Sequence, residues 1–169
     1  MSKLEIKKML EGMDKKELIL FILDMYDSKK EIKDYIDFYA DPDEDKKFQR
    51  AKSIIKDEFF PERGFPRCRL NVLRKTISDF LRLKASPKLE AELMLYLVEC
   101  GCEFSHEFGN LGEDFYISLS TYFDKSLNTL QKIDLLDQYR ENAEKCAKWA
   151  STAKYKFGDE VYNIFSVYF

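Results

Sequence analysis

The chain has 169 residues, of which 45% are apolar and 15% aromatic. That composition can bury a sizeable core within one domain and excludes a disordered chain. The formal net charge is −3 at pH 7, and the longest stretches without a charged side chain have nine residues, far fewer than the roughly 20 apolar residues of a membrane-spanning helix. Charged residues near the start would interrupt the apolar core of a signal peptide. We therefore expect a cytoplasmic protein that does not interact with a membrane.

The residue types that most catalytic centres and metal sites require are scarce. The chain has one histidine, His106, and no glycine-rich phosphate loop. Its four cysteines, Cys68, Cys100, Cys102 and Cys146, are too few for a disulfide scaffold and indicate buried thiols. In a helix, Cys100 and Cys102 would point about 200° apart and could not bind one ion together. We expect no cofactor, no metal and no disulfide.

The first third of the chain carries clear signals of helix boundaries. Ser2 with Glu5, and Asp14 with Glu17, each have the spacing of a capping box. Gly12 between them suits the end of a helix. From residue 15 to about residue 39, apolar side chains recur every three or four positions, as on one face of a helix. This stretch fits either one long helix or two.

Further helices are expected between turn signals along the rest of the chain. Asp41 and Pro42 predict a helix start with Pro42 in the first position, and Pro61 ends that helix. A loop over residues 61–66 precedes an amphipathic helix, and Ser86 with Pro87 starts another. Three more helices are predicted at roughly 113–131, 135–152 and 158–168. The apolar segment Val161–Phe169 should pack into the core.

No segment outside the C-terminus shows sustained alternation of apolar and polar residues, and no Asn-Gly or Asp-Gly hairpin signal is present. We predict an all-α fold of about eight helices, arranged as an irregular bundle or as a short stack of helix pairs resembling an α-α superhelix. No linker rich in Gly, Ser or Pro divides the chain. Residues 1–169 are therefore expected to form a single domain.

A group of glutamates is the only candidate for acid–base chemistry. Glu92, Glu99, Glu103 and Glu107 fall close together on a helical wheel. Such a stripe opposite an apolar face is typical of a solvated helix surface. A small enzyme that works through Glu99 and Glu103 without metal or histidine is the alternative reading. We favour a protein that is not an enzyme.

The distribution of charge is uneven along the chain. Residues 46–88 contain 13 Lys and Arg against 4 Asp and Glu, a net charge of +9, whereas residues 1–45 carry −5 and residues 89–169 carry −7. In the helix expected after Pro66, four cations share one face: Arg67, Arg74, Lys75 and Arg82. This stripe either pairs with the acidic ends of the chain or binds an external anion.

The sequence resembles a family of small all-helical bacterial proteins catalogued as a domain of unknown function. The strings that carry the resemblance lie at residues 3–10, 16–19, 59–61, 69–70, 75–80, 93–96 and 98–99. The likeness covers nearly the whole chain and is most distinctive over residues 59–104. It implies a helical protein and supplies no catalytic residue.

The function that fits these observations is a non-catalytic binding or adaptor module. Its partner would be an acidic protein segment, a phosphate-bearing ligand or, at low affinity, nucleic acid. We expect a monomer or a weak oligomer. The candidate anion-binding residues are the four cations of the stripe.

Overall fold

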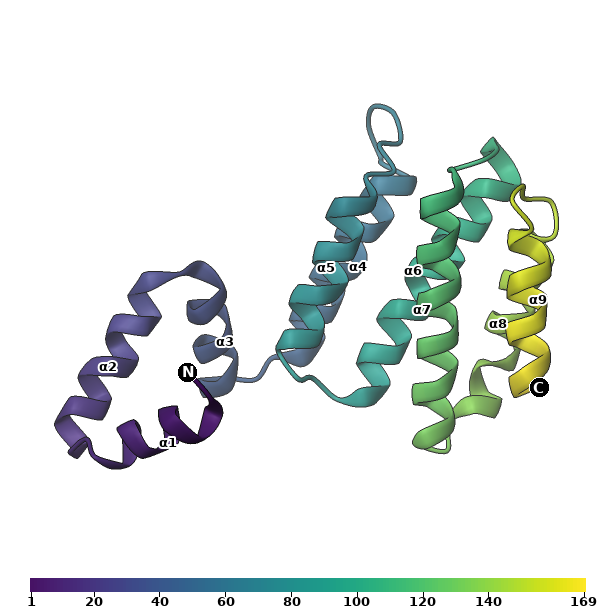
Figure 1. Ribbon diagram of the computed structural model, residues 1–169. Helices are drawn as coiled ribbons and strands as arrows, with labels where there is room; N and C mark the ends of the chain where they lie inside the picture. The colour runs from purple at the N-terminus through teal and green to yellow at the C-terminus, as the bar shows by residue number, and fades with distance from the viewer. The chain divides into compact units, whose positions relative to one another are not determined.

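The computed structural model describes residues 1–169, and all of its regular secondary structure is helical (Figure 1). It contains nine α-helices and one 3-10 helix. The prediction of an all-α fold with about eight helices is therefore confirmed. None of these helices is long and apolar enough to cross a membrane.

The chain divides into two compact units, Met1–Asp43 and Glu44–Phe169. The sequence carries no linker signal at this point, because Asp41 and Pro42 are also compatible with the start of a helix. A single domain over residues 1–169 stays a prediction.

The first unit consists of α1 (Lys3–Glu11), α2 (Lys15–Ser28) and α3 (Lys30–Ala40). Both predicted capping boxes are present: Ser2 with Glu5 opens α1, and Asp14 with Glu17 opens α2. The stretch after residue 15 forms two helices rather than one. Ser28 ends α2, where its hydroxyl donates a hydrogen bond of 2.7 Å to a carbonyl of the preceding turn.

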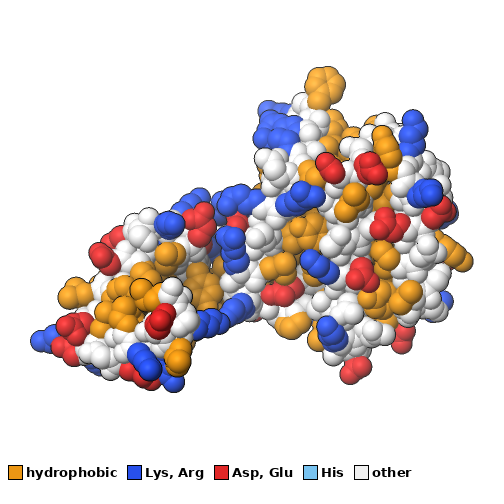
Figure 2. Space-filling view, in the orientation of Figure 1, with side chains coloured by type: hydrophobic (Ala, Val, Ile, Leu, Met, Phe, Trp, Pro, Cys, Tyr) orange, Lys and Arg blue, Asp and Glu red, His pale blue; other side chains and the backbone are white.

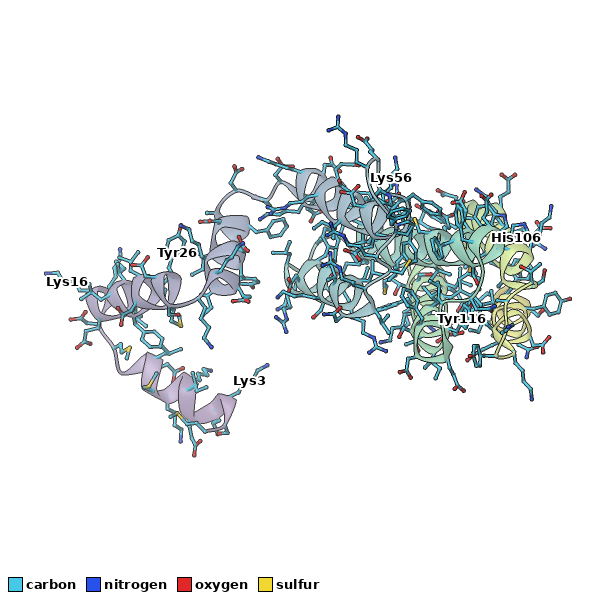
Figure 3. All side chains as sticks on the ribbon, turned by 90° about the horizontal axis from the view of Figure 1, so that it is seen from above. Lys3, Lys16, Tyr26, Lys56, His106 and Tyr116 are labelled. Carbon is cyan, nitrogen blue, oxygen red and sulfur yellow. The ribbon has the colours of Figure 1, made fainter.

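Few side chains of the first unit are buried. Phe38 is its only fully buried residue, and the Tyr26 hydroxyl on α2 donates a 2.8 Å hydrogen bond to Asp37 on α3 (Figure 3).

Several apolar side chains of α2 are exposed, including Leu20 at 67% and Leu23 at 53%. These two residues lie away from the face on which apolar side chains recur every three or four positions, and on that face Leu18, Phe21 and Met25 are half-buried. The helical spacing of α2 was thus predicted correctly.

The second unit contains the hydrophobic core. It comprises α4 (Glu44–Phe59), α5 (Leu70–Arg82), α6 (Pro87–Phe108), α7 (Glu113–Lys132), the 3-10 helix η1 (Leu136–Tyr139), α8 (Arg140–Ala150) and α9 (Phe157–Tyr168). Consecutive helices form the pairs α4–α5, α6–α7 and α8–α9, and α6 contacts the helices on both of its sides (Figure 1). Within this unit the arrangement is the stack of helix pairs that was one of the two expected forms.

The packing between α6 and α7 depends on a glycine. A Cβ atom at Gly101 would lie 2.6 Å from the Cδ1 atom of Leu119, closer than two carbon atoms can approach without rearrangement. Both residues are buried in the middle of the core. Gly101 therefore permits the close approach of the two longest helices.

The C-terminal segment packs into the core, as predicted. Val161 and Phe157 of α9 are completely buried. The ring of Phe157 stacks on the ring of Tyr116 of α7, with 4.4 Å between the ring centroids (Tyr116 is labelled in Figure 3). The 158–168 segment is helical despite its β-branched and aromatic residues, because its apolar side chains recur at helical spacing.

One local prediction was wrong. The fourth helix begins at Glu44 and not at Pro42, because the backbone N–H of Asp43 donates to the carbonyl of Asp41 and forms a tight turn before the helix. The stretch predicted at roughly 135–152 is helical, as expected, and consists of η1 followed directly by α8.

Candidate anion-binding surface

The predicted stripe of four cations is divided between a loop and a helix. Arg74, Lys75 and Arg82 lie on α5, whereas Arg67 lies in the loop before that helix. The expectation that all four share one helical face was therefore wrong for Arg67, because α5 begins only at Leu70. All four side chains are exposed.

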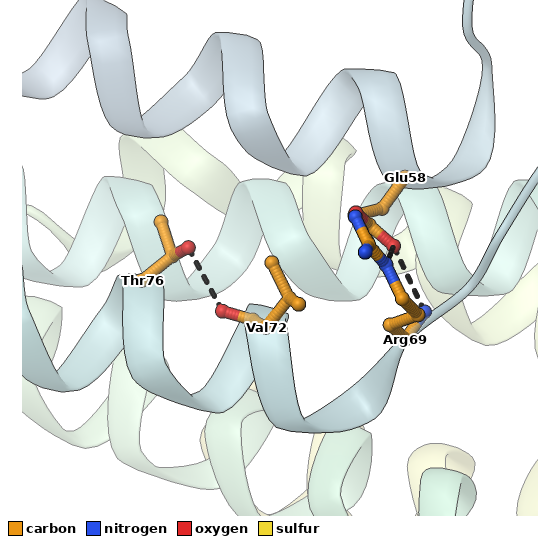
Figure 4. A network of polar contacts seen from close by, with 4 residues as sticks. All are labelled: Glu58, Arg69, Val72 and Thr76. Carbon is orange, nitrogen blue, oxygen red and sulfur yellow. Dashed lines mark hydrogen bonds and ion pairs between the residues drawn. The ribbon is translucent and has the colours of Figure 1, made fainter.

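The loop between α4 and α5 is held by one buried carboxylate. Glu58, near the end of α4, is only 4% exposed. Its Oε2 atom accepts a 3.0 Å hydrogen bond from the backbone N–H of Arg69, and its Oε1 atom lies 2.5 Å from the Arg69 guanidinium (Figure 4). The backbone carbonyl of Glu58 accepts the N–H groups of Arg67 and Cys68 at 3.0 Å each. One residue thus fixes both the backbone and the cation at the end of the loop.

This contact determines the charge state of Glu58. The hydrogen bonds from Arg69 lower the pKa of the Glu58 carboxyl, against the opposing effect of its burial. A lowered pKa keeps this group ionised near neutral pH. Because the Arg69 side chain is about half exposed, the positive charge of the pair remains at the surface while the negative charge is buried.

The cations of α5 have partners close to the helix itself. The Arg74 guanidinium donates to the hydroxyl of Ser118 on α7, at 2.6 and 3.2 Å. Lys75 and Arg82 form ion pairs with Asp79 of the same helix, at 3.2 and 3.8 Å. In these contacts the partners of the three cations are one neutral hydroxyl on α7 and one carboxylate within α5, and pairing with the acidic ends stays a prediction.

In these contacts of α5 the cations outnumber the carboxylates. Asp79 faces two cations, and the partner of Arg74 carries no charge. Figure 2 shows Lys and Arg side chains gathered beside the loop between α4 and α5 and along α5, with a hydrophobic side chain protruding at the tip of the loop. We call this region, consisting of Arg63, Arg67, Arg69, Arg74, Lys75 and Arg82, the basic surface.

A shallow pocket of about 240 Å³ lies between α4, the loop and α6. It is lined by polar and charged side chains: Gln49, Lys52, Ser53, Lys56, Asp57, Glu62 and Tyr96. The Lys52 ammonium lies 4.4 Å from the centroid of the Tyr96 ring, a favourable cation–π contact. Burial raises the pKa of the Tyr96 hydroxyl, so this group stays protonated near neutral pH.

Two glutamates of α6 form hydrogen bonds that connect this helix to the elements packed against it. Glu92 accepts a hydrogen bond from the Tyr139 hydroxyl, and Glu99 accepts one of 2.5 Å from the Asn142 side chain. These contacts tie η1 and α8 to α6. Glu103 does not line the described pocket. The prediction of a solvated stripe was thus wrong for Glu92 and Glu99, which are partly buried.

His106 is exposed near the end of α6, and its Nδ1 atom lies 3.2 Å from the Thr152 hydroxyl (labelled in Figure 3). The cysteines are free thiols, and three of the four are buried. Burial raises the pKa of Cys68 to about 11 and that of Cys100 to about 12. These two thiols are therefore almost entirely protonated near neutral pH, which makes them weak nucleophiles.

Two features of the surface were missed by sequence reasoning. The burial of Glu58 could have been predicted from the sequence, since this residue falls on the same helical face as the core residues Ala51 and Ile55. A carboxylate buried on such a face needs a cation as its partner. The pocket lysines Lys52 and Lys56 are four residues apart and share a helix face. Their position opposite α6 follows only from the tertiary structure.

By its fold and its basic surface, this chain belongs to the class of all-helical proteins and carries a group of cations on one helix pair. The chain belongs to a family of unknown function, DUF6155, whose profile matches residues 1–168. This finding confirms the resemblance to such a family, and the bacterial origin that the resemblance implies stays a prediction. No curated protein and no solved structure matches the chain.

Proposed function

We propose that this protein is a non-catalytic binding module whose basic surface binds an acidic or phosphate-bearing partner. The observation that carries the proposal is a group of three exposed guanidinium groups on α5 and its preceding loop, those of Arg67, Arg74 and Arg82. The hydrogen-bond partner of Arg74 on α7 is an uncharged hydroxyl. Guanidinium groups bind carboxylates and phosphates in a bidentate manner.

Different contacts position the cations at the two ends of the basic surface. At the loop, the hydrogen bonds of Glu58 fix the backbone that carries Arg67. On the helix, the contact with Ser118 orients the Arg74 guanidinium. A partner would therefore meet cations whose positions are already restricted, which lowers the entropy lost on binding.

The test is retention on heparin at low salt, with thermal unfolding measured in parallel. Arg67→Glu combined with Arg82→Glu reverses two exposed cations. It leaves Arg74 unchanged, because replacing Arg74 would also remove its hydrogen bond to Ser118 on α7. Lys125→Glu combined with Lys132→Glu is the matched control. It makes the same change in net charge at two exposed positions of α7.

The proposal expects the wild-type protein and the α7 control to be retained and the Arg67/Arg82 variant to elute early while it still unfolds cooperatively. A small decrease of its melting temperature is expected, because Arg82→Glu places a second carboxylate beside Asp79 in the last turn of α5. Equal retention of the two double variants would contradict the proposal, because binding would then depend on net charge and not on this surface. A wild-type protein that is not retained at all would also contradict it.

A further inference from the structure

The tip of the loop between α4 and α5 exposes an aromatic side chain. Phe65 is 89% exposed, the highest value for any phenylalanine in the chain. Single exposed apolar residues are common on protein surfaces and carry no meaning by themselves. Phe65 differs in its neighbours, because Arg63 and Arg67 are exposed two residues before and two residues after it.

The loop holds this group in place through its backbone. Gly64 has a φ of 87°, in the left-handed region that favours glycine, and turns the chain just before Phe65. Pro66 restricts the backbone just after it. The carbonyl of Glu58 then accepts the N–H groups of Arg67 and Cys68. The aromatic ring and its flanking cations are therefore presented on a tethered loop.

We infer that the basic surface binds single-stranded nucleic acid, with Phe65 stacking on a base and Arg63 and Arg67 contacting the flanking phosphates. This inference rests on the proposed function and names its partner class. Positions two residues apart in the chain are at most about 7 Å apart. The ring and the guanidinium groups can therefore reach a base and the phosphates next to it at the same time.

The chemistry of the tip distinguishes the possible partners. An acidic polypeptide would pair with the arginines, but its acidic side chains have no aromatic face to stack on the exposed ring of Phe65. A membrane would need an apolar helix face or several apolar side chains, and the tip supplies one ring between two charges. A single strand offers both phosphates and unstacked bases, and stacking on an aromatic side chain tolerates any base.

The net negative charge of the chain restricts binding to a short strand but does not prevent it. The excess of negative charge lies in residues 1–45 and 89–169, whereas residues 46–88 contain 4 Asp and Glu against 13 Lys and Arg. At physiological ionic strength, charges separated by more than about 8 Å are largely screened. A short strand held at the loop and α5 would therefore interact mainly with the local excess of cations. Binding should be steeply dependent on salt.

The experiment uses the full chain and two fluorescent probes of equal length and charge. One is an oligothymidine of about 12 nucleotides, and the other is the same backbone without bases. Fluorescence anisotropy at low salt is measured for the wild type and for Phe65→Ala, Phe65→Leu and Phe65→Trp. Phe108→Ala is the matched control, because Phe108 is exposed at 64% but lies at the end of α6.

The expected result is that the wild type binds the oligothymidine at least about fivefold more tightly than the abasic strand, as one stacked base predicts. Phe65→Ala and Phe65→Leu should remove this preference, and Phe65→Trp and Phe108→Ala should keep it. The affinity for the abasic strand should be the same for all the variants.

Three results would overturn the inference while leaving the proposed function intact, provided that heparin retains the wild type. The first is equal binding of both strands by the wild type. The second is competition by polyglutamate as strong as that by the oligothymidine, which would identify an acidic polypeptide as the partner. The third is Phe65-dependent binding to phosphatidylserine vesicles stronger than binding to the strand. If heparin does not retain the wild type, the proposed function fails first.

Discussion

The buried carboxylate of Glu58 permits a quantitative prediction. Glu58→Gln keeps the size of the side chain, and the amide oxygen can still accept the backbone N–H of Arg69. The substitution removes the charge that holds the Arg69 guanidinium at 2.5 Å. A hydrogen bond to a charged group contributes about 1.5–3 kcal/mol. Because the Arg69 side chain is about half exposed and water can replace its partner, we expect the free energy of unfolding to fall by about 2 kcal/mol.

The assay is thermal unfolding followed by far-ultraviolet circular dichroism. A loss of about 2 kcal/mol lowers the melting temperature of a domain of this size by roughly 4–8 °C. Glu107→Gln makes the same chemical change at an exposed position near the end of α6 and should leave the melting temperature unchanged. If Glu58→Gln and Glu107→Gln melt at the wild-type temperature, Glu58 does not stabilise the loop.

The same contact predicts a dependence on pH. Arg69 lowers the pKa of Glu58 in the folded protein, so the native state binds its proton less readily than the unfolded chain, where the pKa of a glutamate is about 4.3. The stabilisation is present above that value and is lost as the pH falls through the lower folded pKa. The difference between wild type and Glu58→Gln should therefore shrink on acidification below about pH 4. A constant difference down to pH 3 would refute the reasoning.

Three further predictions concern the second unit. Gly101→Ala should lower the free energy of unfolding by about 1–3 kcal/mol, because the new Cβ would contact Leu119; chemical denaturation measures this, and an unchanged midpoint would contradict the close approach of α6 and α7. Truncation after Asp159 should lower the melting temperature, since it removes the buried Val161; melting at the wild-type temperature would show that α9 does not stabilise the core. Cys68 should react slowly with iodoacetamide at pH 8 and faster as the pH approaches about 11, where its pKa lies; fast labelling at pH 8 would contradict the raised pKa.

Local signals in the sequence predicted the helices well. The capping boxes at Ser2 and Asp14 and the proline at position 87 mark helix starts that the structure confirms, because caps depend only on neighbouring residues. Helix ends without such a signal could not be located from the sequence. The break between α2 and α3 has no side-chain cap at Lys29, and the sequence left two interpretations open there.

The candidate surface was only partly predictable. Periodicity placed Arg74, Lys75 and Arg82 on one helix, and the run of cations from residue 46 to residue 88 is visible in the sequence. The partner of Arg74 is on a helix 44 residues away in the chain, and no local pattern indicates such a contact. The sequence places Glu58 on the buried face of α4 but does not identify Arg69 as its partner, because that contact depends on how the following loop turns back towards α4.

The central claim is that the basic surface binds anions, and the salt dependence of binding tests it most directly. For the oligothymidine, the logarithm of the binding constant should fall linearly with the logarithm of salt concentration, with a slope of about −0.7 for each phosphate contacted. Arg67→Glu combined with Arg82→Glu should make that slope less negative by about 1.4, corresponding to two lost contacts. Identical slopes for the wild type and this variant, or wild-type binding that does not change with salt, would contradict the claim.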